Sequence, residues 1–290
     1  FVPTLVKNED GTILNNIKDV AVGQNWLLLV TEEGKVLSCG SNTFGFLGDG
    51  TTVESLTFKT GLVAENEPLI GIVSVATTEN GSSFALTENG EVYGWGRNSY
   101  GELCQNNTTP SYYVQKLQKV NNIIKISAGY GHIAMLTSDG QILTAGYNTA
   151  GQLGNETKTN SAIAVPMIDS TGNIIYGAKD ISVGRDFTIV TKEDNTIWFT
   201  GDNDGILLST GSKSDATVLT QIIKATDENF EDIKEIFALD DSLYMSKTTG
   251  GMYVLGEGAS GKLFNGTTTV PTSAEEVLLD KNIIKNENLK

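Results

Sequence analysis

Few residues in this chain are of the types that catalyse reactions or bind transition metals. His132 is the single histidine, and Cys39 and Cys104 are the two cysteines. A general base needs a partner within hydrogen-bond reach, and a zinc site needs several Cys or His ligands at short spacings. His132 has no second histidine and no motif-linked nucleophile to work with, so packing in the core is the favoured interpretation. The two cysteines are predicted to be buried or half-buried free thiols.

Two short motifs resemble ligand sites. Residues 256–261, GEGASG, match the dinucleotide-binding pattern G-x-G-x-x-G, but that site needs a following helix, and KLFNGTTTVP is not a helical sequence. Residues 202–205, DNDG, resemble half of a calcium loop, yet Thr200 and Gly211 stand where further acidic ligands are required. We therefore predict no catalytic residue, no bound cofactor, no metal site and no enzymatic activity.

The composition limits the classes of partner. The chain has 290 residues, a hydrophobic content of 39% and a formal net charge of −15. A surface with this charge repels phosphate groups, which argues against nucleic acid and anionic membranes as partners. No apolar run is long enough to cross a bilayer, so membrane insertion is not expected. The compartment is left open, with an extracellular or cell-surface location favoured over the cytoplasm.

Glycines recur along the chain at intervals of 56, 50, 55 and 55 residues. These anchor positions are Gly40, Gly96, Gly146, Gly201 and Gly256. Apolar residues stand three and four positions before each anchor, and a turn-forming Gly or Asn stands six before it. Such agreement over five copies indicates an internal structural repeat.

Each repeat is predicted to form four short antiparallel strands. TEEGKV, TENGEV and TSDGQI place a turn-forming pair between two apolar segments, as in a tight hairpin. The flanking segments, such as HIAMLT and QILTAG, are too short for independent helices and suit strands. Four strands in each unit of 50–56 residues are typical of one blade of a β-propeller. The predicted fold class is therefore an all-β propeller of four-stranded blades.

A loop of the form G-x-N-x-x-G-x-L-G follows the third strand and is best preserved as GYNTAGQLG, residues 146–154. On these residues the chain resembles the regulator of chromosome condensation repeat family, whose members usually close seven blades. The resemblance covers nearly the whole chain, so residues 1–290 are predicted to be one propeller domain or a fragment of one. We count five full units, and we interpret residues 273–285 as two strands of a further unit. A complete small ring and part of a seven-bladed ring both remain open.

Antiparallel strand directions place the first and third connections of every blade at the same end. The repeated Asn and Leu of these loops are predicted to be structural, so function should lie in the residues that vary. Aromatic and arginine side chains carry much of the energy of protein interfaces. The predicted partner-binding residues are Trp26, Phe44, Phe46, Arg97, Tyr100, Tyr130, Tyr147, Arg185 and Phe187. The opposite face carries acidic hairpin tips.

The favoured function is a non-enzymatic module that binds a partner protein through the aromatic-bearing face, in a larger secreted or surface protein. The resemblance implies two alternatives. One is a guanine-nucleotide exchange factor for a small GTPase, although no repeat has room for a large wedge insertion. The other is a proteinaceous inhibitor of an extracellular enzyme such as a β-lactamase.

Overall fold

The computed structural model describes residue 7 and residues 12–65, 67–203, 214–223, 230–256 and 275–277. All the regular elements in this part of the chain are β-strands, so the all-β prediction is confirmed. The described residues contain no helix that could span a bilayer. Residues 257–261 of the GEGASG stretch, for which no dinucleotide site was expected, lie outside the described residues.

The described residues form five four-stranded antiparallel sheets, each built from consecutive strands. The first contains β1 (Ile17–Val22), β2 (Trp26–Thr31), β3 (Val36–Gly40) and β4 (Ser55–Thr60). The second contains β7 (Ile72–Thr77), β8 (Ser82–Thr87), β9 (Val92–Gly96) and β10 (Ser111–Lys116). The third contains β11 (Ile123–Ala128), β12 (His132–Thr137), β13 (Ile142–Gly146) and β14 (Ser161–Pro166).

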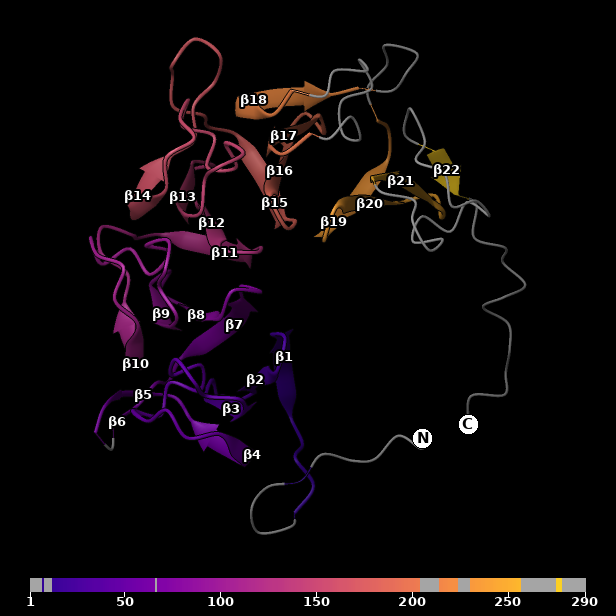
Figure 1. Cartoon of the computed structure of the whole chain (residues 1–290). Helices are drawn as coiled ribbons and strands as arrows, with labels where there is room; N and C mark the ends of the chain where they lie inside the picture. Colours follow the sequence, from indigo (N-terminus) through magenta and orange to yellow (C-terminus); the bar gives the residue numbers. More distant parts are fainter. Residues whose placement is uncertain are drawn as a thin grey trace, which may run out of the picture.

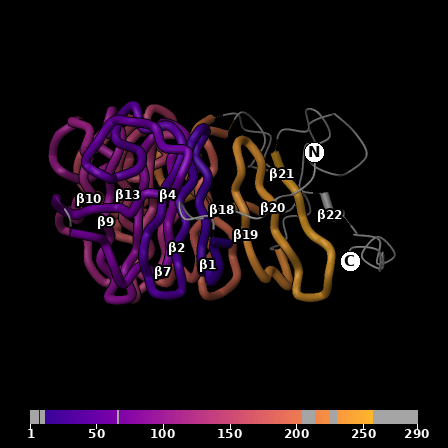
Figure 2. The backbone as a smooth tube through the Cα atoms, turned by 90° about the horizontal axis from the view of Figure 1, so that it is seen from below, coloured from indigo at the N-terminus to yellow at the C-terminus, as the bar shows by residue number. Residues whose placement is uncertain are grey.

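The fourth sheet contains β15 (Ala178–Val183), β16 (Phe187–Lys192), β17 (Ile197–Gly201) and β18 (Ala216–Ile222). The fifth contains β19 (Ile233–Leu239), β20 (Ser242–Lys247), β21 (Met252–Gly256) and β22 (Glu275–Val277). Figure 1 shows the sheets side by side around an arc, with the first strand of each sheet innermost. Figure 2 shows the arc edge-on, with strands running between its two faces. This arrangement is that of propeller blades.

The hydrophobic core lies between neighbouring sheets. Each junction of adjacent sheets buries one apolar cluster, for example Leu28 and Val36 of the first sheet against Ile72 and Val75 of the second. A short sheet has two apolar faces, and stacking in a series covers both. At the start of the arc this cover is missing from the described residues, where Val20 of β1 is 54% exposed.

The anchor glycines have a steric reason to recur. Gly146 ends β13 with a φ of 103°, and a Cβ there would lie 2.3 Å from the carbonyl oxygen of Gly131. Gly40, Gly96, Gly201 and Gly256 repeat this close approach to the turn that precedes the second strand. Only glycine combines a positive φ with such a contact, so the anchors fix how the second and third strands meet.

Two details differ from the sequence interpretation. Residues 273–285 were predicted to be two strands of a further unit, but β22 pairs with β21 and completes the fifth sheet. It takes the place that β10 has beside β9. Residues 282–285 lie outside the described residues. The small hairpin of β5 (Leu62–Ala64) and β6 (Glu67–Pro68) was not predicted.

Candidate functional site

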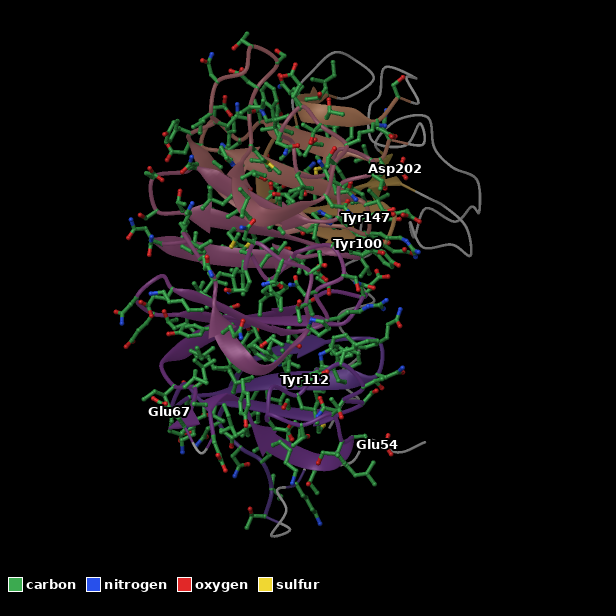
Figure 3. The ribbon with its side chains drawn as sticks, turned by 60° about the vertical axis from the view of Figure 1, so that its left-hand side comes forward. Glu54, Glu67, Tyr100, Tyr112, Tyr147 and Asp202 are labelled. Carbon is green, nitrogen blue, oxygen red and sulfur yellow. The ribbon has the colours of Figure 1, made fainter. Side chains whose placement is uncertain are left out.

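The connections after the first and third strands of each sheet emerge at one end of the sheets, which we call the loop face. In the first sheet these connections are residues 23–25 and 41–54. Hairpin tips such as Glu32 and Glu33 join the second strand to the third and lie at the opposite end. Figure 3 shows Tyr100 and Tyr147 of the loop face close together, with Glu67 on the other side of the molecule.

The repeated asparagine braces each long loop from inside. Asn148 is fully buried, and its side-chain Nδ2 donates hydrogen bonds to Asn155 Oδ1 and to the carbonyl oxygens of Thr157 and Thr159 at 3.0–3.2 Å. Its Oδ1 accepts a hydrogen bond from the backbone N–H of Leu153 at 2.9 Å. Asn42 and Asn98 make corresponding contacts in their own loops. One buried amide therefore holds the shape of each loop.

The residue before the repeated leucine of each loop differs between units and lies at the junction with the next sheet. It is Phe46 in the first loop, Glu102 in the second and Gln152 in the third. The Glu102 carboxylate is buried, and it accepts hydrogen bonds from Ser82 Oγ at 2.8 Å and from the Tyr100 N–H at 2.9 Å. Burial raises the pKa of Glu102 although these donors act in the opposite direction.

Four of the nine predicted residues form a first aromatic cluster on the loop face. The rings of Trp26 and Phe46 stack with centroids 4.7 Å apart, and Phe44 lies 6.0 Å from Phe46. The guanidinium carbon of Arg97, from the second sheet, lies 5.1 Å from the centre of the Phe44 ring. Tertiary structure therefore joins a loop of the first sheet to a loop of the second.

Four more form a second cluster across three sheets. Tyr100, Tyr130 and Tyr147 contact one another, with ring centroids 4.6–6.2 Å apart. Arg185 of the fourth sheet places its guanidinium carbon 5.2 Å from the centre of the Tyr130 ring. Burial and the neighbouring tyrosines raise the pKa of Tyr100 to about 12. The Tyr100 phenol is therefore a neutral hydrogen-bonding group at physiological pH.

Carboxylates surround Arg185. Its nitrogens lie 3.9 Å from Glu79, 3.7 Å from Asp186 and 3.9 Å from Asp240, which come from three sheets. Burial, helped by the neighbouring acidic groups, raises the pKa of Asp186 to about 6, and Arg185 acts in the opposite direction. The arginine therefore offsets part of the negative charge where the inner strands end.

Two of the predicted residues are less accessible than expected for loop tips. Trp26 and Phe187 are only 4% and 2% exposed. Both open the second strand of a sheet and occupy the same position as His132 in the repeat. The side chain at this position points into a junction between sheets, so the accessible surface belongs mainly to the other seven residues.

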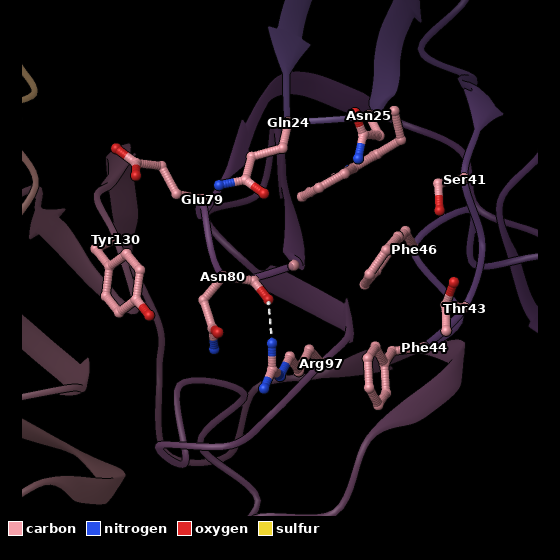
Figure 4. A pocket seen from close by; sticks show the side chains of 12 residues that line it. Gln24, Asn25, Ser41, Thr43, Phe44, Phe46, Glu79, Asn80, Arg97 and Tyr130 are labelled. Carbon is pink, nitrogen blue, oxygen red and sulfur yellow. Dashed lines mark hydrogen bonds between the residues drawn. The ribbon is translucent and has the colours of Figure 1, made fainter.

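A pocket of about 310 Å³ opens beside the first cluster (Figure 4). It is lined by Phe44, Phe46, Arg97 and Tyr130 together with polar residues of the short turns, including Gln24, Glu79 and Asn80. Glu79 and Asn80 were missed by sequence reasoning, because the second unit has no glycine seventeen residues before its anchor. The turn could have been found from the repeat, because Ser82 stands fourteen residues before its anchor, as His132 does, and residues 79–81 precede it.

The single histidine has a structural environment. His132 is fully buried, and its Nε2 lies 3.0 Å from Thr188 Oγ1 of the fourth sheet. The Thr188 hydroxyl donates to the carbonyl oxygen of Gln152 at 2.9 Å, so the imidazole donates through Nε2–H. Burial lowers the pKa of His132 to about 3, with the Phe187 backbone acting in the opposite direction. The residue joins two sheets as a neutral ring.

The cysteines and acidic groups of the described residues form neither a disulfide nor a metal-like cluster. Cys39 is half-buried and Cys104 is buried, and both are free thiols, as the sequence predicted. Within the same residues no group of His, Cys, Asp and Glu has a geometry suited to a metal ion. The Asp202-Asn203 part of the calcium-like motif is described, and the rest of that motif is not.

Comparison with known protein families agrees with the repeat seen in the sheets. Residues 89–136 match the regulator of chromosome condensation (RCC1) repeat, and a second model of the same repeat matches residues 72–102 and 123–152. The chain belongs to the RCC1 repeat family. The matched residues include the second sheet and the first three strands of the third.

Curated relatives are much longer proteins. Human HERC4, described as a probable E3 ubiquitin-protein ligase, is 30% identical over 202 residues. The match covers 68% of this chain and 18% of HERC4, so the chain spans less than a fifth of that relative.

Solved structures share the fold. Human WBSCR16 superposes with a TM-score of 0.75 at 18% identity, covering 90% of this chain and 66% of that protein. Yeast RCC1 (Prp20), solved with Kap60, superposes with a TM-score of 0.65 at 22% identity, covering 86% of this chain and 56% of Prp20. These likenesses establish the propeller fold alone.

Proposed function

We propose that this RCC1-repeat chain is a non-enzymatic module that binds a partner protein through its loop face. The observation that carries the proposal is the pair of aromatic and arginine clusters, which stand on loops braced by the repeated asparagines. A rigid base lets exposed side chains bind without a large ordering cost. Aromatic and arginine residues are also the types that dominate interface energies.

The net charge and the similarity to a solved structure support a protein as the partner. The net charge of −15 disfavours nucleic acid. A solved relative of the same fold, Prp20, was crystallised bound to another protein, Kap60. The match to HERC4 covers too little of that protein for its ligase activity to be assigned to this chain. No contact among the described residues favours an exchange factor or an enzyme inhibitor over a general interaction module.

The test is capture of a partner from the native source by the immobilised chain, followed by affinity measurement with variants. Phe44→Ala and Arg185→Ala remove one exposed residue from each cluster. Each is expected to weaken the captured partner roughly tenfold or more, as central interface residues do. The melting temperature should change little, because surface substitutions usually stay within about 0.5 kcal/mol.

The matched control is the double charge reversal Glu32→Lys and Glu33→Lys at a hairpin tip on the opposite face. It should leave the affinity unchanged at physiological salt. If this control abolishes capture while Phe44→Ala and Arg185→Ala do not, the binding face has been assigned wrongly. If the two alanine variants unfold the protein, the clusters cap the sheets and do not bind a partner.

A further inference from the structure

The guanidinium of Arg97 is held in a fixed orientation on the loop face. Its Nε donates a hydrogen bond to Ser99 Oγ at 2.8 Å, and its Nη1 lies 3.5 Å from the carbonyl oxygen of Asn80. The Phe44 ring supports it at 5.1 Å (Figure 4). An arginine fixed in this way loses little side-chain freedom when it binds a ligand.

Arg97 retains unused hydrogen-bonding capacity. A guanidinium has five N–H donors, and the contacts to Ser99 and Asn80 occupy two of them. Arg97 forms no ion pair with a carboxylate in the described part of the chain, whereas Arg185, the other arginine, has three carboxylates within 4 Å. The chain has a net charge of −15, so a guanidinium that lacks a carboxylate partner among the described residues provides a local positive charge on an acidic protein.

The pocket beside Arg97 combines this cation with apolar walls. Phe44 and Phe46 line one side, and Asn80 and Tyr130 line the other. Its volume of about 310 Å³ is at the lower end of the range for ligand sites. The space therefore suits one side chain or a small group and not a large cofactor.

We propose that Arg97 and this pocket form a carboxylate-binding subsite, which receives an acidic side chain of a partner protein next to an apolar residue. The proposal rests on the proposed function in one respect, that a protein partner delivers the carboxylate. The planar guanidinium fork matches the two oxygens of a carboxylate, and such charge-assisted pairs are strong. Glu79 on the pocket wall and the net charge disfavour a phosphate dianion more than a singly charged carboxylate.

The experiment uses small probes and the full chain labelled with ¹⁵N. Sodium phenylacetate carries a carboxylate beside an aromatic ring, and phenylacetamide is its neutral isostere. Phenylacetate is expected to bind in the millimolar range, to shift the Nε–Hε resonance of Arg97, and to bind at least fivefold more tightly than phenylacetamide. The Arg97→Gln variant should lose this preference, and Arg97→Lys should weaken it because the fork is lost.

Lys192→Gln is the matched control, since Lys192 also lies over an aromatic ring, 4.0 Å from the centre of Trp198, outside the pocket. It should leave phenylacetate binding unchanged. Equal binding of the acid and the amide, or unchanged binding to Arg97→Gln with a normal melting temperature, would overturn the subsite. Tighter binding of phenyl phosphate than of phenylacetate would overturn the assignment to carboxylates.

The same variants separate the subsite from the proposed function. If phenylacetate binds through Arg97 but partner capture is insensitive to Phe44→Ala and Arg185→Ala, the interaction face is wrong and the subsite stands. If capture is lost in those variants but phenylacetate does not recognise Arg97, the face stands and the subsite is wrong.

Discussion

The buried histidine makes the stability of the fold depend on pH in a predictable direction. Burial lowers the folded-state pKa of His132 to about 3, whereas an exposed histidine in the unfolded chain has a value near 6.5. Between these values the unfolded state takes up a proton that the folded state does not. The free energy of unfolding is therefore unaffected by this histidine above pH 6.5, and it decreases as the pH falls from 6.5 towards 3. The histidine penalises the folded state by about 2 kcal/mol at pH 5.0, since one pH unit corresponds to about 1.4 kcal/mol.

The substitution His132→Ser isolates this effect. Ser82 and Ser242 hold the position equivalent to His132 in the second and fifth sheets, so a serine is compatible with the start of this strand. Urea unfolding at pH 7.0 and 5.0 should show that the wild type loses about 2 kcal/mol more than the variant over this interval. The comparison removes the opposite contributions of Glu102 and Asp186, whose raised pKa values stabilise the fold as the pH falls. pH 5.0 stays above the sequence pI of about 4.5.

Two readouts can refute the reasoning. His132 is the only histidine, so its ring protons can be followed directly by NMR in the folded protein. They should not titrate between pH 7.0 and 5.0. A folded-state titration near pH 6.5, or an equal loss of stability in the wild type and the variant, would contradict a buried neutral ring. His132→Phe, with the residue used at Phe187, provides the comparison if the serine variant does not fold.

Three further predictions follow from the packing. Asn148→Ala should lower the free energy of unfolding, measured in urea, by about 3 kcal/mol, because the Leu153 N–H and the Thr157 carbonyl oxygen lose their hydrogen-bond partner. The control Asn173→Ala, in an exposed turn, should change it by less than about 1 kcal/mol. Gly101→Ala should lower the free energy of unfolding by about 2 kcal/mol more than Gly172→Ala. The two glycines have similar positive φ angles, but only a Cβ at position 101 would meet backbone atoms, those of Ala162. Equal losses of stability in the two variants would contradict this. In the folded protein a thiol reagent should leave Cys104 unmodified, because burial raises its pKa to about 12; two thiols reacting at one rate without denaturant would refute this.

The sequence by itself determined the repeat, the strand order within each unit and the face on which the variable loops meet. These features depend on local chemistry, such as the turn at Gly140, the positive φ of Gly146 and the spacing of apolar residues in His132–Thr137. Local chemistry is visible in a single stretch of chain. The end at which two loops emerge follows from the number of antiparallel strands between them.

Tertiary structure alone decided which side chains on that face are accessible and which charges they meet. Trp26 and Phe187 are buried because a neighbouring sheet covers the position that opens the second strand, and nothing in either stretch of sequence records that neighbour. Arg97 and Arg185 both follow a glycine and come from loops of the same face. Arg185 is surrounded by carboxylates from three sheets, whereas Arg97 rests on an aromatic ring and forms no ion pair among the residues that the structure describes. The difference arises because ion pairs are set by residues that are distant in sequence and close in space.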